Sequence, residues 1–107
     1  MSAANAETVE LPSHFTQPQL VGLKDIVNHH RENGHTVRFD AKEVERIDGA
    51  AVQFMVAVSA LQGHSDSQPM LVELNEVVLK AFDDMGVHEH ISIDPSALEA
   101  VRANQHA

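Results

Sequence analysis

The sequence predicts an α/β fold in which four helices pack on a sheet of about four strands, mostly parallel or mixed. Two observations support this class. Four candidate N-cap residues, each between two apolar residues, precede segments with helical periodicity. Short apolar segments separate these helices, and strands that alternate with helices are typical of largely parallel sheets. The chain of 107 residues is long enough for one domain with its own core.

The first helix is expected over residues 17–32. Thr16 is its N-cap, and Gln19 completes a capping box with that threonine. Gly34 is the expected stop, because glycine readily adopts the left-handed conformation that ends a helix. The residues that recur on one face of this helix are Leu20, Leu23, Val27 and His30.

The second helix is expected to begin after Asp48 and to run to about residue 62. Its sequence, GAAVQFMVAVSALQ, is apolar nearly all round, which predicts that the helix is buried. The run VQFMVAVS is also compatible with a buried strand, but the length of the segment, its alanines and its N-cap favour a helix.

Two further helices follow in the second half of the chain. Asn75 is the N-cap of the third, which ends at Gly86. Its apolar stripe consists of Val78, Phe82 and Met85. Asp94 is the N-cap of the fourth, and Pro95 occupies the first turn, where proline is favoured.

The remaining apolar segments are predicted to be strands. They are TVEL (8–11), TVRFD (36–40), MLVEL (70–74) and HISI (90–93). The segment GHSDSQP, residues 63–69, is the expected flexible loop. We expect residues 1–7 to be a disordered N-terminus, residues 8–103 to form the domain and residues 104–107 to form a C-terminal tail.

Composition excludes several classes of protein and site. Sixteen acidic against seven basic residues give a formal charge of −9, which opposes binding to nucleic acid. The absence of cysteine excludes disulfides and thiolate metal sites. No apolar run approaches the roughly 20 residues of a membrane span, and the N-terminus lacks the features of a signal peptide, so we expect a soluble, cytoplasmic protein without membrane insertion.

The eight histidines do not form a recognisable metal motif. His88 and His90 share a face if their segment is a strand, but no third ligand is marked. The adjacent His29 and His30 point about 100° apart on a helix. We therefore expect solvated or capping histidines and no metal.

The sequence also lacks a recognisable catalytic site. Asp40 ends an apolar strand, as the acceptor of a phosphoaspartate receiver does, but magnesium needs acidic residues at another strand end, and the first strand ends in Leu-Pro. No cysteine nucleophile and no Gly-x-Ser-x-Gly elbow is present. We expect no enzymatic activity, no catalytic residues and no cofactor.

Three segments resemble the STAS domain, the family named for sulfate transporters and anti-sigma factor antagonists. TVRFDAKEVERIDGAAVQFMVA resembles the strand, link and helix at the centre of the family pattern. NEVVLKAFDDMGVHEHI is similar to its second signature, and LPSHFTQPQLVGLKDIVNHH is similar to its first helix. The resemblance implies a STAS-like fold, with the usual extra N-terminal strand short or missing.

The resemblance also implies a docking site at the start of the second helix. In anti-sigma factor antagonists, a partner kinase phosphorylates a hydroxyl residue that corresponds to Ala50 here, so this chain lacks the phosphorylation position. The implied partner-binding residues are Asp48, Gly49, Ala50 and Ala51, with Gly86 nearby. The alternative is that the small residues 49–51 only pack against a neighbouring loop.

The implied function is that of a bacterial anti-sigma factor antagonist or a chemotaxis-associated STAS protein in signal transduction, locked in the unphosphorylated state. Its partner would be a histidine-kinase-like ATPase or another signalling protein. The alternative is the cytoplasmic STAS subunit of a phospholipid ABC transporter, although such subunits usually have threonine at the position of Gly49.

Overall fold

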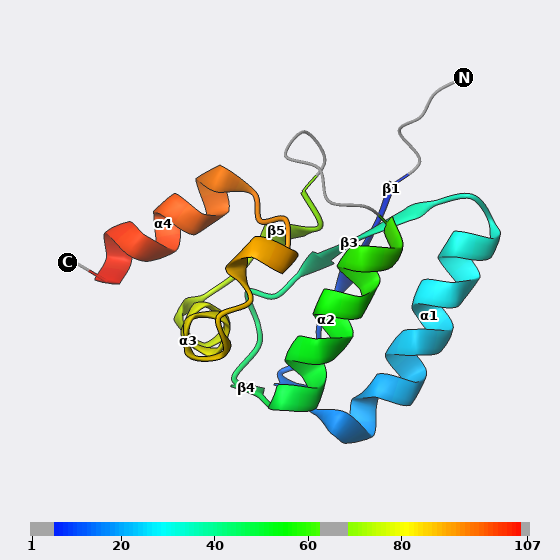
Figure 1. Ribbon diagram of the computed structural model, residues 1–107, viewed down its shortest axis with the longest axis horizontal. Helices are drawn as coiled ribbons and strands as arrows, with labels where there is room; N and C mark the ends of the chain where they lie inside the picture. Colours follow the sequence, from blue (N-terminus) through cyan, green and yellow to red (C-terminus); the bar gives the residue numbers. More distant parts are fainter. Residues whose placement is uncertain (1–5, 63–68, 106–107) are drawn as a thin grey trace.

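The helices lie where their N-caps and glycine stops predict them. A computed structural model describes residues 6–62 and 69–105 (Figure 1). Within these ranges the α-helices are α1 (Leu20–Glu32), α2 (Gly49–Gln62), α3 (Glu76–Met85) and α4 (Pro95–Gln105). A short 3₁₀ helix, η1 (Gln17–Gln19), leads into α1, so the predicted first helix is confirmed as two consecutive pieces. Most of the loop predicted at 63–69 lies outside the described residues.

The described strands form two small parallel sheets instead of one sheet of about four strands. The larger sheet has the order β1 (Ala6–Glu10), β3 (Thr36–Asp40) and β5 (Leu71–Glu73). The smaller one pairs β2 (His14–Phe15) with β4 (Arg46–Ile47).

The interruption between the two sheets has a local cause. The chain turns after β3, where the Val44 N–H donates to the Ala41 carbonyl at 3.2 Å. Pairing resumes when the N–H groups of Glu45 and Arg46 donate to the Ser13 carbonyl at 2.7 and 3.0 Å. The second sheet therefore restores the pairing of the same two chain segments after a gap.

The prediction of a strand over residues 90–93 is wrong. This region contains the 3₁₀ helix η2 (His88–His90), and Ile93 makes only an isolated parallel bridge to Leu71. His90 belongs to η2, where its N–H donates to the Val87 carbonyl at 2.8 Å, so only residues 91–93 separate this 3₁₀ helix from the N-cap of α4, Asp94. Its side chain accepts the Ser96 N–H at 2.9 Å, as an N-cap does.

Two predicted boundaries also differ from the structure. β1 begins at Ala6, so Ala6 and Glu7 belong to the sheet and not to a disordered N-terminus. Helix α4 continues to Gln105, two residues into the segment that we expected to be a tail.

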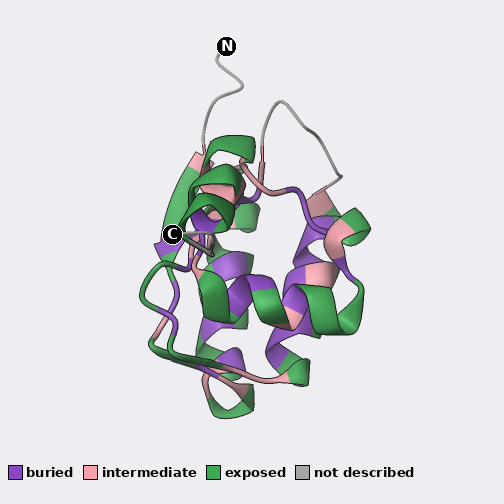
Figure 2. Cartoon of the chain, turned by 90° about the vertical axis from the view of Figure 1, so that its left-hand side faces the viewer, coloured by how far each residue is buried: buried purple, intermediate pink, exposed green. Residues whose placement is uncertain are grey.

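The core lies between the larger sheet and the helices. α1 and α2 run side by side along the sheet in Figure 1, and Figure 2 shows that buried residues occupy the inner sides of the elements and exposed residues their outer sides. Val37 and Phe39 of β3 are buried at 1% and 0% exposure. Phe54 of α2 makes edge contacts with Phe39 and Phe15 at ring-centroid distances of 6.1 and 6.2 Å.

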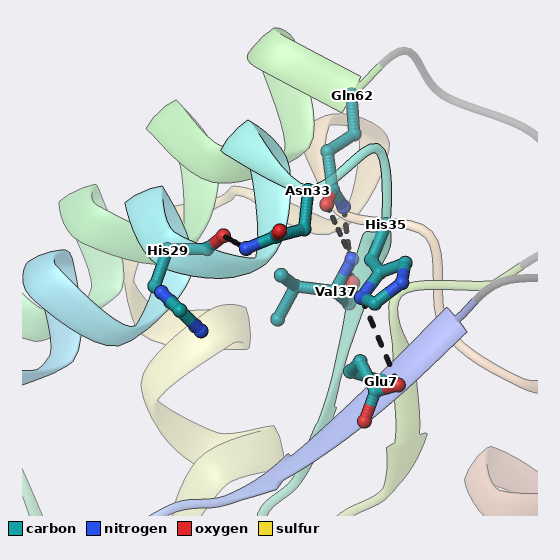
Figure 3. Close-up of polar contacts among 6 residues, drawn as sticks. All are labelled: Glu7, His29, Asn33, His35, Val37 and Gln62. Carbon is teal, nitrogen blue, oxygen red and sulfur yellow. Dashed lines mark hydrogen bonds and ion pairs between the residues drawn. The ribbon is translucent and has the colours of Figure 1, made fainter.

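One side-chain amide replaces a missing strand at the edge of β3. β5 begins opposite Phe39, so Val37 has no strand partner on that side. Gln62, the last residue of α2, supplies both hydrogen bonds: its Nε2 donates to the Val37 carbonyl at 3.0 Å, and its Oε1 accepts the Val37 N–H at 2.6 Å (Figure 3). The end of α2 is thereby joined to the sheet.

Replacing Gln62 with leucine is expected to lower the free energy of unfolding by about 0.5–1.5 kcal/mol, because two backbone groups of Val37 lose their partners. The local measurement is amide hydrogen exchange, which should accelerate at Val37 more than at Phe39. Gln62→Glu retains the acceptor and loses the donor, so its effect on Val37 exchange should be intermediate. Unchanged exchange at Val37 in Gln62→Leu would contradict this role.

Candidate functional site

Asp48 joins the beginnings of two helices. Its Oδ1 accepts the Ala51 N–H at 2.9 Å, which is the predicted N-cap of α2. Its Oδ2 accepts the N–H of Gln17, the first residue of η1, also at 2.9 Å. One carboxylate thus satisfies free N–H groups of α2 and η1, and both helix ends favour a negative charge there.

The three small residues after Asp48 have different environments. Ala51 is 0% exposed and lies in the core, so it packs inside the fold and presents no surface to a partner. The partner-binding role assigned to it is therefore wrong, because burial explains its small size. Gly49 and Ala50 are exposed and remain candidates for contact.

The fold does not require glycine at position 49. Positive φ angles among the described residues occur at Gly34 and Gly86, so Gly49 has an ordinary backbone conformation. A Cβ atom placed on Gly49 would meet Met85 Cε at 3.9 Å, which is an ordinary van der Waals contact. The minimal side chain at this exposed helix start therefore lacks a structural reason.

At position 86, in contrast, the backbone conformation explains the glycine. It ends α3 in the left-handed conformation with a φ of 65°. The N–H of Val87 then donates to the Phe82 carbonyl at 3.2 Å, as in a Schellman motif. Gly86 is exposed, and its neighbour Met85 extends the surface around Gly49.

The sequence pattern did not identify Met85 as a surface residue. Helical spacing placed it in the buried stripe with Val78 and Phe82, which are 1% and 0% exposed, but Met85 is 40% exposed. The stripe ends one residue before Gly86, so the last turn of α3 projects beyond the core. Methionine is flexible and can adapt its shape to different neighbours.

Two grooves lie on either side of the α2 N-terminus. The β4–α3 groove has a volume of about 600 Å³ and is lined by Thr16, Glu45, Arg46, Ile47, Asp48, Val77, Lys80, Ala81 and Asp84. Within it, Lys80 Nζ lies 3.0 Å from Asp84 Oδ2. The α1–α2 groove has a volume of about 460 Å³ and contains Ala50 in its lining. A further hollow of about 220 Å³ extends it along the same helices.

The histidines of the described residues make local contacts. The ring centroids of His29 and His30 lie 5.7 Å apart, and those of His30 and His35 lie 6.1 Å apart. His35 Nδ1 lies 3.8 Å from Glu7 Oε2, which joins the start of β3 to β1 (Figure 3). His88 Nε2 pairs with Asp83 Oδ1 across the end of α3. His88 and His90 belong to the 3₁₀ helix η2, so the strand geometry considered for them is absent. Across residues 6–62 and 69–105, no three His, Asp or Glu side chains are arranged to hold a metal ion.

Asp40 has an acidic neighbour that the sequence interpretation overlooked. β1 ends at Glu10, not in Leu-Pro, and Glu10 is in register with Asp40, which is also in register with Glu73 of β5. Lys42 lies among these carboxylates, with Nζ 3.3 Å from Asp40 Oδ2. The hydrogen bond to Asp40, followed by its charge and by the charges of Glu73 and Glu10, raises the pKa of Lys42 above its ordinary value. Asp40 is thus paired with the Lys42 ammonium group.

The chain was compared with protein-family models, curated proteins and solved structures, and none of them matched. No helix in the described part of the chain is long and apolar enough to cross a membrane.

Proposed function

We propose that this chain is a non-enzymatic docking module of the STAS type, which binds a signalling protein through the start of α2. The observation that supports this proposal best is the exposure of Gly49 and Ala50, two minimal residues at a capped helix start. The backbone conformation does not demand Gly49, and small residues allow the backbone of a partner to approach closely.

The surroundings of these two residues also fit a contact with protein. Met85 provides an adaptable apolar side chain beside Gly49, while the two grooves add shape on either side of the helix start. Asp48 has a structural part in this surface, because both of its carboxylate oxygens already accept backbone N–H groups. It orients the start of α2 and leaves Gly49 and Ala50 to make the contacts.

Ala50 also determines how the module is regulated. A phosphate at a helix N-terminus adds about −1.5 to −2 charge and forms charge-assisted bonds with free N–H groups. Alanine has no hydroxyl to accept a phosphate, so the module remains competent to dock whenever its partner is present. The partner class that the STAS resemblance implies is a histidine-kinase-like ATPase or another signalling protein.

Ala50→Asp is expected to weaken partner binding about tenfold or more, because it places an unpaired carboxylate in the contact. The measurement is affinity capture of the tagged full chain from lysate of its own cells, followed by mass spectrometry and titration of the captured partner. A negative charge near a helix N-terminus favours the helix, so loss of binding would not reflect unfolding of α2.

Two further variants make this test specific. Ala60→Asp introduces the same charge at another exposed position of α2 and should leave binding unchanged. Ala50→Ser should bind normally unless a kinase is present. A signalling ATPase lost only in Ala50→Asp supports the proposal, whereas capture of transporter subunits would favour lipid transport. Unchanged affinity in Ala50→Asp would place the interface elsewhere.

A further inference from the structure

The outer sides of α1 and α2 form an apolar groove that extends beyond the start of α2. The α1–α2 groove, including its extension, is lined by one helical stripe from each helix and by Gln17 of η1. The stripe of α1 consists of Leu20, Val21, Lys24, Val27 and Asn28. The stripe of α2 consists of Ala50, Gln53, Phe54, Ala57, Val58 and Leu61. Both follow the spacing of residues that share one side of a helix.

The groove contains apolar surface that the fold itself leaves uncovered. Val21 and Leu61 are 71% and 63% exposed, more than any other large apolar side chain in the described ranges. Single exposed apolar residues are ordinary on protein surfaces, but these two line opposite ends of one groove. The nearly buried Phe54 lies between them and lines both parts. The result is a continuous apolar path along two helices.

Lys24 gives this path a definite charge. It lines both parts of the groove and is the one charged residue in the lining. No carboxylate of residues 6–62 or 69–105 forms an ion pair with it, although the chain has sixteen acidic residues and a net charge of −9. An ammonium group without an ion-pair partner among the described residues, in an apolar groove of an acidic protein, favours an occupant with a carboxylate at that position.

We infer that the α1–α2 groove binds an amphipathic helix of a partner protein, which places apolar side chains in the groove and one carboxylate against Lys24. A helix satisfies its own backbone hydrogen bonds, whereas an extended segment lying on two helices would find no free backbone groups to pair with. The α2 stripe from Ala50 to Leu61 measures roughly 16 Å at 1.5 Å per residue, which corresponds to about three turns of the occupant.

A second copy of this chain fits the groove less well than such a partner. In a two-fold symmetric contact centred on the groove, the same patch would face itself. Each Lys24 ammonium would then approach the other, and like charges at an interface oppose association. The charge of Lys24 therefore favours a different chain.

This inference rests on the proposed docking function, because it describes the chemistry of the partner segment. The test uses the full ¹⁵N-labelled chain and two synthetic helical peptides of about three turns. Both have leucines along one face; one has a glutamate between the leucines, and the other has a lysine at the same position. Amide chemical shifts locate the bound peptide and give its affinity without the natural partner, so this test and the Ala50 experiment can fail separately.

We expect shifts at Lys24, Ala57 and Leu61, and an affinity about threefold higher for the glutamate peptide, as for a surface ion pair. Lys24→Glu should reverse the order of the two peptides. Ala57→Arg should abolish binding of both by filling the groove, while Ile26→Ser, on an exposed part of α1 outside the groove, should change nothing.

Several results would overturn the inference. These are the absence of binding by either peptide, shifts outside the groove, and equal affinities that Lys24→Glu does not alter. Concentration-dependent shifts of the groove residues without peptide would show that a second copy occupies the groove.

Discussion

Asn75→Asp is expected to lower the free energy of unfolding by about 2–4 kcal/mol, although the two side chains have the same shape. The Asn75 Oδ1 accepts the Val78 N–H at 3.1 Å, and aspartate retains this N-cap of α3. The Nδ2 donates to the carbonyls of Val44 and Lys42 at 2.7 and 3.0 Å, and aspartate cannot replace these donors. It would instead bring a carboxylate oxygen against two carbonyl oxygens.

Urea denaturation measures this effect, with a lower midpoint and an unchanged slope as the expected result. Asp94→Asn is the matched control, because it makes the reverse exchange at an N-cap whose side chain only accepts a hydrogen bond, from the Ser96 N–H. Its stability should change by less than about 0.5 kcal/mol. If both variants lost similar stability, the amide donors of Asn75 would not be responsible.

Asp48→Ala is expected to lower the free energy of unfolding by about 1.5–3 kcal/mol. Loss of the N-cap of α2 alone costs about 0.5–2 kcal/mol, and loss of the bond to the Gln17 N–H adds about 1 kcal/mol. Asp48→Asn should have an intermediate effect, because its single amide oxygen can accept from only one of the two N–H groups. Thermal unfolding of the three proteins measures this series.

The outcome of the Asp48 series distinguishes a local from a tertiary role. If Asp48 only caps α2, asparagine should replace it without loss of stability, since both residues cap helices well. If Asp48 also bridges η1 and α2, Asp48→Asn should have a clearly lower free energy of unfolding than the unaltered chain. Equal stability of Asp48→Asn and the unaltered chain would therefore contradict the bridging role and leave Asp48 only its role as the N-cap of α2.

The helices were predictable from the sequence because their signals are local. Asn75 and Asp94 were each identified as N-caps, and each accepts an N–H group two or three residues later. Gly34 and Gly86 were identified as stops, and both adopt positive φ. Strand 36–40 was also predicted with its observed bounds, since it alternates buried and less buried residues.

The sheets and the candidate site were less predictable. The division into two sheets depends on the turn after β3. The strand predicted at 90–93 is lost because its first residue belongs to the 3₁₀ helix η2, which the short apolar run HISI does not indicate. At the site, all three small residues after Asp48 look alike in sequence, yet Ala51 is buried while Gly49 and Ala50 are exposed.

By itself, the sequence determined the α/β class, the four helices and the residues that begin and end them, because these depend on contacts between residues a few positions apart. Only the tertiary structure determined that Asp48 bonds Gln17 over 31 positions, that Gln62 bonds Val37 over 25 and that Asn75 bonds Lys42 over 33. It also determined the α1–α2 groove, because the position of Lys24 beside Ala57 depends on how two helices pack on the sheet. A single sequence contains no periodicity that specifies such packing.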